Sequence, residues 1–161
     1  MKIGFGYDVH RLKNGRACIL CGVEIPCSFG PDGHSDADVA IHALMDAILG
    51  ALALGDIGKI FPDTDKKWKN ADSKELLKTV YAMARRQGYI ISNADITIVL
   101  ETPRIAPYIT QMRDVIAGAL DTDVNNISVK ATTEESPELG GEGGFAKSFA
   151  VVLLVSFEPL C

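Results

Sequence analysis

The sequence lacks any run of about 18 or more uncharged apolar residues, the minimum expected of a membrane-spanning helix. Its first residues, MKIGFGYD, lack the charged segment and the long apolar core of a signal peptide. Internal repeats, low-complexity tracts and linkers are missing as well. We therefore expect one soluble, cytoplasmic domain that spans residues 1–161 and has no membrane partner.

Positive charge is also scarce, since 16 Lys and Arg residues stand against 21 Asp and Glu residues and the net charge is −5. No strongly basic segment is present, which argues against a nucleic-acid partner. An acidic protein can still bind small phosphates where metal ions and backbone N–H groups supply the positive field.

Cysteine is limited to four residues, Cys18, Cys21, Cys27 and Cys161. The first two form a C-x-x-C motif, but no second pair and no nearby histidine completes a zinc knuckle. We expect reduced thiols with a structural role.

Apolar periodicity, cap residues and glycines divide the chain into strands and helices of ordinary length. The expected strands cover 1–9, 16–25, 93–100, 126–133 and 145–157, with a loop over 10–15. The expected helices run from a cap at Ser35 to about Leu54, from a cap at Ser73 to Gly88, and from about Tyr108 to Leu120. This mixture favours an α+β fold with a small mixed sheet covered by helices on one face. A sheet face without helices would need burial by other subunits, so a homo-oligomer is expected.

Acidic residues and histidines near the N-terminus form the first candidate site. Asp8 and His10 are two apart on a strand, so their side chains leave the same face. Asp38, His42 and Asp46 follow one another at intervals of four on an apolar helix and form one polar stripe. One aspartate and two histidines suit a zinc site with an open fourth position. A hydrogen-bonded core histidine is the alternative interpretation of His42.

Two further clusters are weaker. The segment GDIGKIFPDTD has three aspartates that could accept hydrogen bonds from sugar-type hydroxyls, although a solvated acidic loop explains them equally well. The segment KATTEE ends a strand with two threonines that could hold phosphate and a glutamate that could hold Mg²⁺. Strand ends often finish in this way without a ligand.

Taken together, four segments closely resemble the family of 2-C-methyl-D-erythritol 2,4-cyclodiphosphate synthases: GYDVHRL, GHSDADVAIHALMDAILGALALGDIGKIFPDTD, ADS and VKATTEE. The resemblance extends from Lys2 to about Glu135 and resumes in the last strand. It implies a homotrimer with sheets packed around the three-fold axis and active sites between subunits. It also implies a phosphorus–oxygen lyase of non-mevalonate isoprenoid biosynthesis. This enzyme converts 4-diphosphocytidyl-2-C-methyl-D-erythritol 2-phosphate to the 2,4-cyclodiphosphate and CMP by metal-assisted intramolecular phosphoryl transfer.

The resemblance also implies residue roles. A Zn²⁺ or similar divalent cation would be bound by Asp8, His10 and His42, and a Mg²⁺ or Mn²⁺ on the substrate diphosphate by Glu135. His34 and Thr133 would stabilise the transition state, and the helix N-terminus at Ser35 would direct N–H groups at a phosphate. Cytidine would contact mainly the backbone of Leu100–Ala106. The full set of implied substrate contacts is Asp8, Val9, His10, His34, Ser35, Asp56, Ile57, Gly58, Phe61, Pro62, Asp63, Thr64, Asp65, Leu100, Glu101, Thr102, Pro103, Arg104, Ile105, Ala106, Thr132, Thr133, Glu134 and Glu135.

One segment departs from the family pattern. SPELGGEGGF stands where the family has Leu-Gly-Phe followed by Gly-Arg-Gly-Glu-Gly, so Leu139 takes the aromatic position and Glu142 the arginine position. We expect no phosphate contact from this loop. Two other functions stay open: a metal-dependent phosphoesterase that uses the same triad and an activated water, and a non-enzymatic trimer that carries metal or isoprenoid phosphate.

Overall fold

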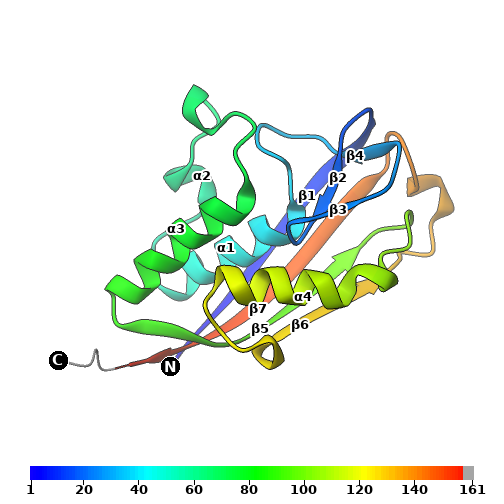
Figure 1. Ribbon diagram of the computed structural model, residues 1–161. Helices are drawn as coiled ribbons and strands as arrows, with labels where there is room; N and C mark the ends of the chain where they lie inside the picture. The colour runs from blue at the N-terminus through cyan, green and yellow to red at the C-terminus, as the bar shows by residue number, and fades with distance from the viewer. Residues whose placement is uncertain (158–161) are drawn as a thin grey trace.

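Two long antiparallel strands, β1 and β7, run side by side through the five-stranded main sheet of the computed structural model, which describes residues 1–157 (Figure 1). The strand order is β4-β1-β7-β5-β6, and only the β5–β6 pair is parallel, so the sheet is mixed. The strands are β1 (Lys2–Asn14), β2 (Cys18–Leu20), β3 (Val23–Ile25), β4 (Phe29–Pro31), β5 (Tyr89–Val99), β6 (Ile127–Thr132) and β7 (Phe145–Ser156). The helices are α1 (Val39–Ala51), α2 (Ile57–Ile60), α3 (Ser73–Arg86) and α4 (Ile109–Ala119), with 3-10 turns η1 (Lys66–Trp68), η2 (Ala106–Tyr108), η3 (Val124–Asn126) and η4 (Pro137–Leu139).

Helix α1 packs directly onto β1 and β7 and forms the centre of the core (Figure 1). A Cβ built on Gly6 would lie 1.9 Å from the carbonyl oxygen of Ala43, and one on Gly4 would lie 1.8 Å from that of Ala47. Only glycine allows the two backbones to approach this closely. The contact places His42 of α1 beside Asp8, which lies two residues after Gly6 on the same face of β1.

Helices α3 and α4 complete the helical layer on the same side of the sheet (Figure 1). Helix α3 buries one face, whereas α1 is buried nearly all round, which explains the unusually apolar sequence of α1. Within residues 1–157, no helix combines the length and apolar character that a membrane crossing requires.

In the described part of the chain, the opposite face of the sheet has no helical cover and exposes large apolar side chains. Phe5 is 61% exposed, although its neighbours in sequence on β1 face the core. The uncovered apolar set is Ile3, Phe5, Tyr7, Val9, Phe149 and Val151. The prediction of an α+β fold with helices on one sheet face is therefore confirmed for the described residues.

Several predicted boundaries are wrong. The first strand continues through His10 to Asn14, where a loop was expected, because β4 pairs with residues 12–14. Residues 16–25 form two short strands instead of one, because Cys21 and Gly22 adopt positive φ angles of 51° and 73° and turn the chain. The segment between the first two expected helices contains the short helix α2 and the turn η1, neither of which was predicted.

The helix caps also differ from those predicted. Asp38 caps α1, because its carboxylate accepts the N–H groups of Ala40 and Ile41, so Ser35 is not the N-cap. Asp72 in turn caps α3 in place of Ser73. Ser35 therefore lies in the loop before α1, and the N-terminus of the helix is at Asp38 and not at Ser35 as expected.

Among the described cysteines, Cys18, Cys21 and Cys27 are free thiols, and their structural role stays a prediction. Cys18 and Cys21 are buried beside the turn of the β2–β3 hairpin. Cys161 lies outside the described residues.

Candidate metal and substrate site

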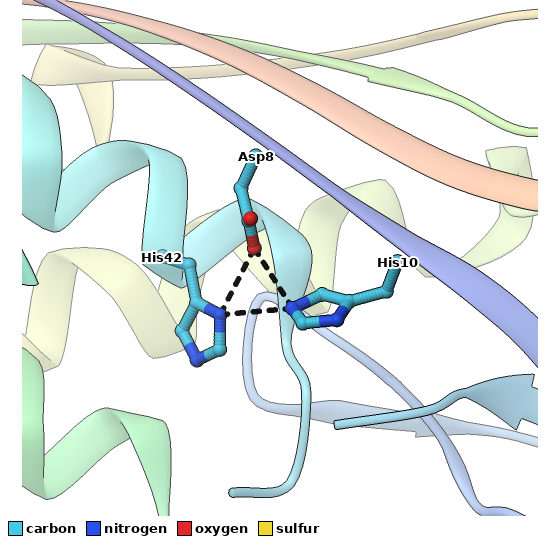
Figure 2. Close-up of side chains that lie close together, drawn as sticks. All are labelled: Asp8, His10 and His42. Atoms are coloured by element: carbon cyan, nitrogen blue, oxygen red, sulfur yellow. Dashed lines mark hydrogen bonds and ion pairs between the residues drawn. The ribbon is translucent and has the colours of Figure 1, made fainter. Parts of the chain in front are cut away.

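Asp8 and His10 of β1 and His42 of α1 direct one side-chain atom each toward a common point (Figure 2). Asp8 Oδ2 lies 3.0 Å from His10 Nε2 and 2.9 Å from His42 Nδ1, and the two nitrogens are 3.3 Å apart. Ligands about 2.1 Å from a tetrahedral zinc ion are themselves about 3.4 Å apart. The three residues therefore fit a divalent cation with little rearrangement, which favours the zinc site over the alternative of a core histidine at position 42.

The ring orientation of His10 is determined by its other nitrogen. His10 Nδ1 lies 2.9 Å from the carbonyl oxygen of Asp32, and a carbonyl can only accept a hydrogen bond. Nδ1 must therefore carry the hydrogen, which leaves the lone pair of Nε2 for a metal. Metal-binding histidines commonly have such a carbonyl or carboxylate partner.

The charges of the triad are strongly coupled. Burial alone would raise the pKa of the Asp8 carboxyl, but hydrogen bonds from His10 and His42 and their positive charge hold that pKa well below its usual range. Burial alone would lower the pKa of His10, but the hydrogen bond and negative charge of Asp8 raise it. The site thus attracts positive charge, so protons and a divalent cation compete for the same atoms.

A cavity of about 470 Å³ opens beside the triad. Its size suits a small organic ligand. Its lining includes six further residues from the predicted substrate set: His34, Ser35, Ile57, Gly58, Phe61 and Asp63. Gly33, Met45, Trp68 and Leu76 also line it and were not predicted. Met45 and Leu76 are indistinguishable from core residues in the sequence, whereas the single tryptophan in a polar loop was a signal that could have been used.

Other predicted substrate residues do not line this cavity. Val9 lies on the uncovered sheet face, 37% exposed. Asp56 accepts the N–H of Lys59 at 3.0 Å and caps α2, and Asp65 accepts the N–H of Lys67 at 3.0 Å. The remaining members outside the lining are Pro62 and Thr64, together with the residues of the 100–106 and 132–135 segments.

The polar stripe predicted on α1 separates into three different roles. Asp38 is fully buried, and its carboxylate also accepts the N–H groups of Cys21 and Gly22, which ties the β2–β3 hairpin to α1. Burial raises the pKa of Asp38 to about 6, although bonds from Gly22 and Ile41 oppose the shift. Asp46 Oδ1 accepts the N–H of Ile57 at 2.8 Å and fixes the start of α2 beside the cavity. Only His42 faces the possible metal site.

The two other predicted segments meet each other at the ends of the parallel strands β5 and β6. The N–H of Leu100 donates to the carbonyl of Thr132 at 3.0 Å. The carboxylate of Glu101 accepts the N–H of Glu134 at 2.6 Å and that of Ser136 at 3.4 Å. The segments 100–106 and 132–135 therefore form one cluster, as a shared ligand would require, but it is distinct from the triad cavity.

The triad and the Thr132 side chain of this second cluster lie on opposite faces of the sheet. Asp8 faces α1, whereas Val9 faces away from the helices. In the strand register, Val9 pairs with Lys147, Lys147 with Val99, and Val99 with Thr132, so these side chains share the uncovered face. Within one chain the sheet thus separates the Thr132 side chain from the triad.

The loop that departs from the family pattern is held against β1. Asn14 Nδ2 donates to the Glu142 carboxylate. The backbone N–H of Leu12 donates to Gly144 O at 2.8 Å, and that of Gly143 donates to Leu12 O at 3.0 Å. Glu142 therefore has a structural partner in this protein.

Comparisons with known proteins agree with one another over nearly the whole chain. The sequence model of the YgbB family matches residues 1–155. The 2-C-methyl-D-erythritol 2,4-cyclodiphosphate synthase of Clostridioides difficile is 54% identical over 158 residues, which cover 97% of this chain and 98% of that one. The enzyme of that name from Vibrio vulnificus is 52% identical over 155 residues, covering 96% and 98%. A solved structure of a 2C-methyl-D-erythritol-2,4-cyclodiphosphate synthase bound to CDP superposes with a TM-score of 0.88 at 35% identity, covering 96% of this chain and 100% of that one. The chain therefore belongs to the YgbB family.

Proposed function

We propose that this protein converts 4-diphosphocytidyl-2-C-methyl-D-erythritol 2-phosphate to 2-C-methyl-D-erythritol 2,4-cyclodiphosphate and CMP, a step of non-mevalonate isoprenoid biosynthesis. The convergence of Asp8, His10 and His42 beside a cavity lined by His34 and Ser35 is the observation that carries the proposal. The two relatives that are 54% and 52% identical to it are both named after this activity.

In the proposed reaction, an oxygen of the 2-phosphate attacks the β-phosphorus, the bond to the CMP oxygen breaks, and CMP leaves. The nucleophile is already an anion, so little proton transfer is needed. The protein has to hold two phosphate groups that repel each other in line for attack. His34 and Ser35 line the cavity next to the triad and are assigned to phosphate contacts there.

Asp8, His10 and His42 are assigned to one divalent cation, most simply Zn²⁺, and Glu135 to a Mg²⁺ or Mn²⁺ that accompanies the substrate. Such cations neutralise phosphate charge and polarise the phosphorus–oxygen bonds. Thr133 is assigned to transition-state contacts, and the backbone of Leu100–Ala106 to cytidine. The CDP-bound relative supports a cytidine nucleotide as ligand.

We also propose a homotrimer with active sites between subunits. The uncovered sheet face exposes apolar side chains such as Phe5 and Ile3, and Ile3 is 73% exposed, more than is usual for a solvated strand. Because the triad and Thr132 lie on opposite faces of one sheet, a second chain is needed to complete a site that uses both. Native mass spectrometry should give three times the 17.3 kDa chain mass, and Phe5→Asp should reduce the measured mass to that of a single chain. A wild-type monomer would contradict the assembly.

The activity is tested with the purified protein, the cytidine diphospho-substrate, Zn²⁺ and Mg²⁺. CMP release is followed chromatographically, and ³¹P NMR identifies the second product. A cyclic diphosphate is expected, and His42→Ala should abolish its formation. An open-chain monophosphate would instead identify a phosphoesterase, and the absence of CMP with both metals present would refute the proposal. A cytoplasmic location stays a prediction, which cell fractionation would test.

A further inference from the structure

The second ring nitrogen of His42 lies in the core behind the triad. His42 Nε2 is 3.1 Å from Ser73 Oγ and 3.2 Å from Ser35 Oγ. When Nδ1 of a neutral imidazole binds a metal, Nε2 has to carry the hydrogen. His42 is only 7% exposed, so that N–H needs a protein acceptor.

Ser73 offers an acceptor of defined direction. It is fully buried, and its hydroxyl donates to Oδ1 of Asp36, because a carboxylate can only accept. Its backbone N–H donates to the other oxygen of Asp36 at 2.9 Å. Since the hydroxyl hydrogen is used by Asp36, Ser73 Oγ can present only a lone pair to His42.

Ser35 is less constrained. Its hydroxyl oxygen accepts the N–H of Ala37 at 3.1 Å, and its side chain lines the cavity. Among residues 1–157, no acceptor other than His42 fixes the direction of its hydrogen, so it can donate either to a ligand or to His42. Ser73 is therefore the hydroxyl that can determine which nitrogen of His42 carries the hydrogen.

The same contacts join three separate segments. Asp36 belongs to the loop before α1, Ser73 begins α3, and His42 lies on the first turn and a half of α1. Two backbone bonds, from Asp36 N to Ala71 O at 3.2 Å and from Asn70 N to His34 O at 2.9 Å, hold the loop to the start of α3. The serine and the aspartate are thus fixed relative to His42 before any ligand binds.

We propose that Asp36 and Ser73 are positioning residues for the metal ligand His42. The Asp36 carboxylate orients the Ser73 hydroxyl, and that hydroxyl accepts the Nε2–H of His42 and holds Nδ1 toward the cation. The inference rests on the metal role proposed above for the triad, and it does not depend on which reaction the site performs. Neither residue touches the substrate in this scheme.

The zinc dissociation constant tests the inference without measuring catalysis. Competition against a chromophoric chelator should give a constant about 10- to 100-fold weaker for Ser73→Ala, the range found when such a partner of a ligand is removed. Ser73→Thr keeps the hydroxyl and should stay close to wild type. Thr79→Ala on the same helix α3, whose hydroxyl donates only to the Glu75 carbonyl, is the matched control and should not change the constant.

Two further measurements separate a positioning role from a general loss of structure. If Asp36 acts through Ser73, Asp36→Asn should weaken zinc binding, but adding it to Ser73→Ala should weaken binding no further. In zinc-loaded wild-type protein with ¹⁵N-labelled histidine, His42 should show a metal-bound Nδ1 and a protonated Nε2. This signal needs no variant to fold, and it should shift or vanish in Ser73→Ala.

The outcomes are distinguishable. A Ser73→Ala protein that binds zinc like wild type, or a wild-type His42 bound to zinc through Nε2, overturns the inference and leaves the proposed reaction intact. Zinc binding with the expected variant effects but no CMP release overturns the reaction and leaves the inference. A wild-type protein that binds no divalent cation overturns both.

Discussion

The contact between β1 and α1 yields the sharpest prediction, because a single methyl group should disturb both stability and metal binding. In Gly6→Ala the new Cβ would lie 1.9 Å from Ala43 O, 2.7 Å from Ala47 N and 2.9 Å from Ala43 C. All three are backbone atoms of α1, so no change of rotamer can relieve the clash. An ordinary contact is about 3.4 Å, and the helix therefore has to move by about 1.5 Å.

That displacement exceeds what the triad can absorb. His42 directly precedes Ala43, and Asp8 lies two residues after Gly6, so the shift separates ligands on the two elements. Metal–ligand distances tolerate changes of only about 0.2 Å. We expect Gly6→Ala to lose about 1–3 kcal/mol of unfolding free energy from overpacking. We also expect it to bind zinc at least about 10-fold more weakly, the effect found when a residue that orients a metal ligand is removed.

Gly50→Ala is the matched control on the same helix. Its added Cβ would meet only Phe5 O, at 3.8 Å, and Gly50 is exposed. Replacing a helical glycine by alanine should stabilise the protein by about 0.5–1 kcal/mol and leave zinc binding unchanged. Urea unfolding and a competitive zinc titration measure both variants. A Gly6→Ala protein with wild-type values in both assays would refute the account of how α1 and β1 meet.

Three other predictions follow from the site and the cap of α1. In the absence of metal, Asp8 raises the pKa of His10, so protonated His10 stabilises the metal-free protein at low pH. This contribution to the unfolding free energy is lost as the pH rises through the raised pKa. Between about pH 5 and 8 zinc affinity should rise, and a flat zinc titration would contradict the ligand assignment. The single tryptophan, Trp68, packs edge-to-face on Phe61 in the cavity wall, with the two ring centroids 4.9 Å apart. CDP binding should therefore change the fluorescence of Trp68. Unchanged emission when calorimetry shows the protein saturated with CDP would show that the ligand does not affect this wall. Asp38→Asn places an amide N–H₂ among four backbone N–H donors and should cost about 1–3 kcal/mol in urea unfolding, whereas a wild-type midpoint would disprove the capping role.

Local periodicity was sufficient to suggest the three residues of the candidate metal site but not the partners that support them. A spacing of two on a strand places Asp8 and His10 on one face, and a position on an apolar helix brings His42 against that face. Asp46 has the same helical spacing as His42, yet its partner is the N–H of Ile57, eleven residues away. Such a partner depends on the path of the chain after α1, which no periodicity describes.

The errors in the fold have a similar origin. Residues 10–14 are polar apart from Leu12 and are followed by Gly15, so they resemble a loop, but pairing with β4 extends the strand there. Ser35 is a good N-cap by residue type, and the chain instead uses Asp38, whose carboxylate also binds the hairpin turn at Cys21. In each case a contact with a segment distant in sequence overrides the local preference.

The separation of the triad from the Thr132–Glu135 segment by the sheet has a genetic consequence. In the proposed homotrimer, each catalytic centre takes Asp8, His10 and His42 from one polypeptide and the Thr132–Glu135 segment from a neighbour. Two inactive alleles, one encoding His42→Ala and the other Thr133→Ala, would therefore complement each other when expressed together. In some mixed trimers, one site would combine the intact His42 of one chain with the intact Thr133 of its neighbour. Two alleles damaged in the same half would fail to complement, so growth alone would reveal which residues belong to the same half of a centre.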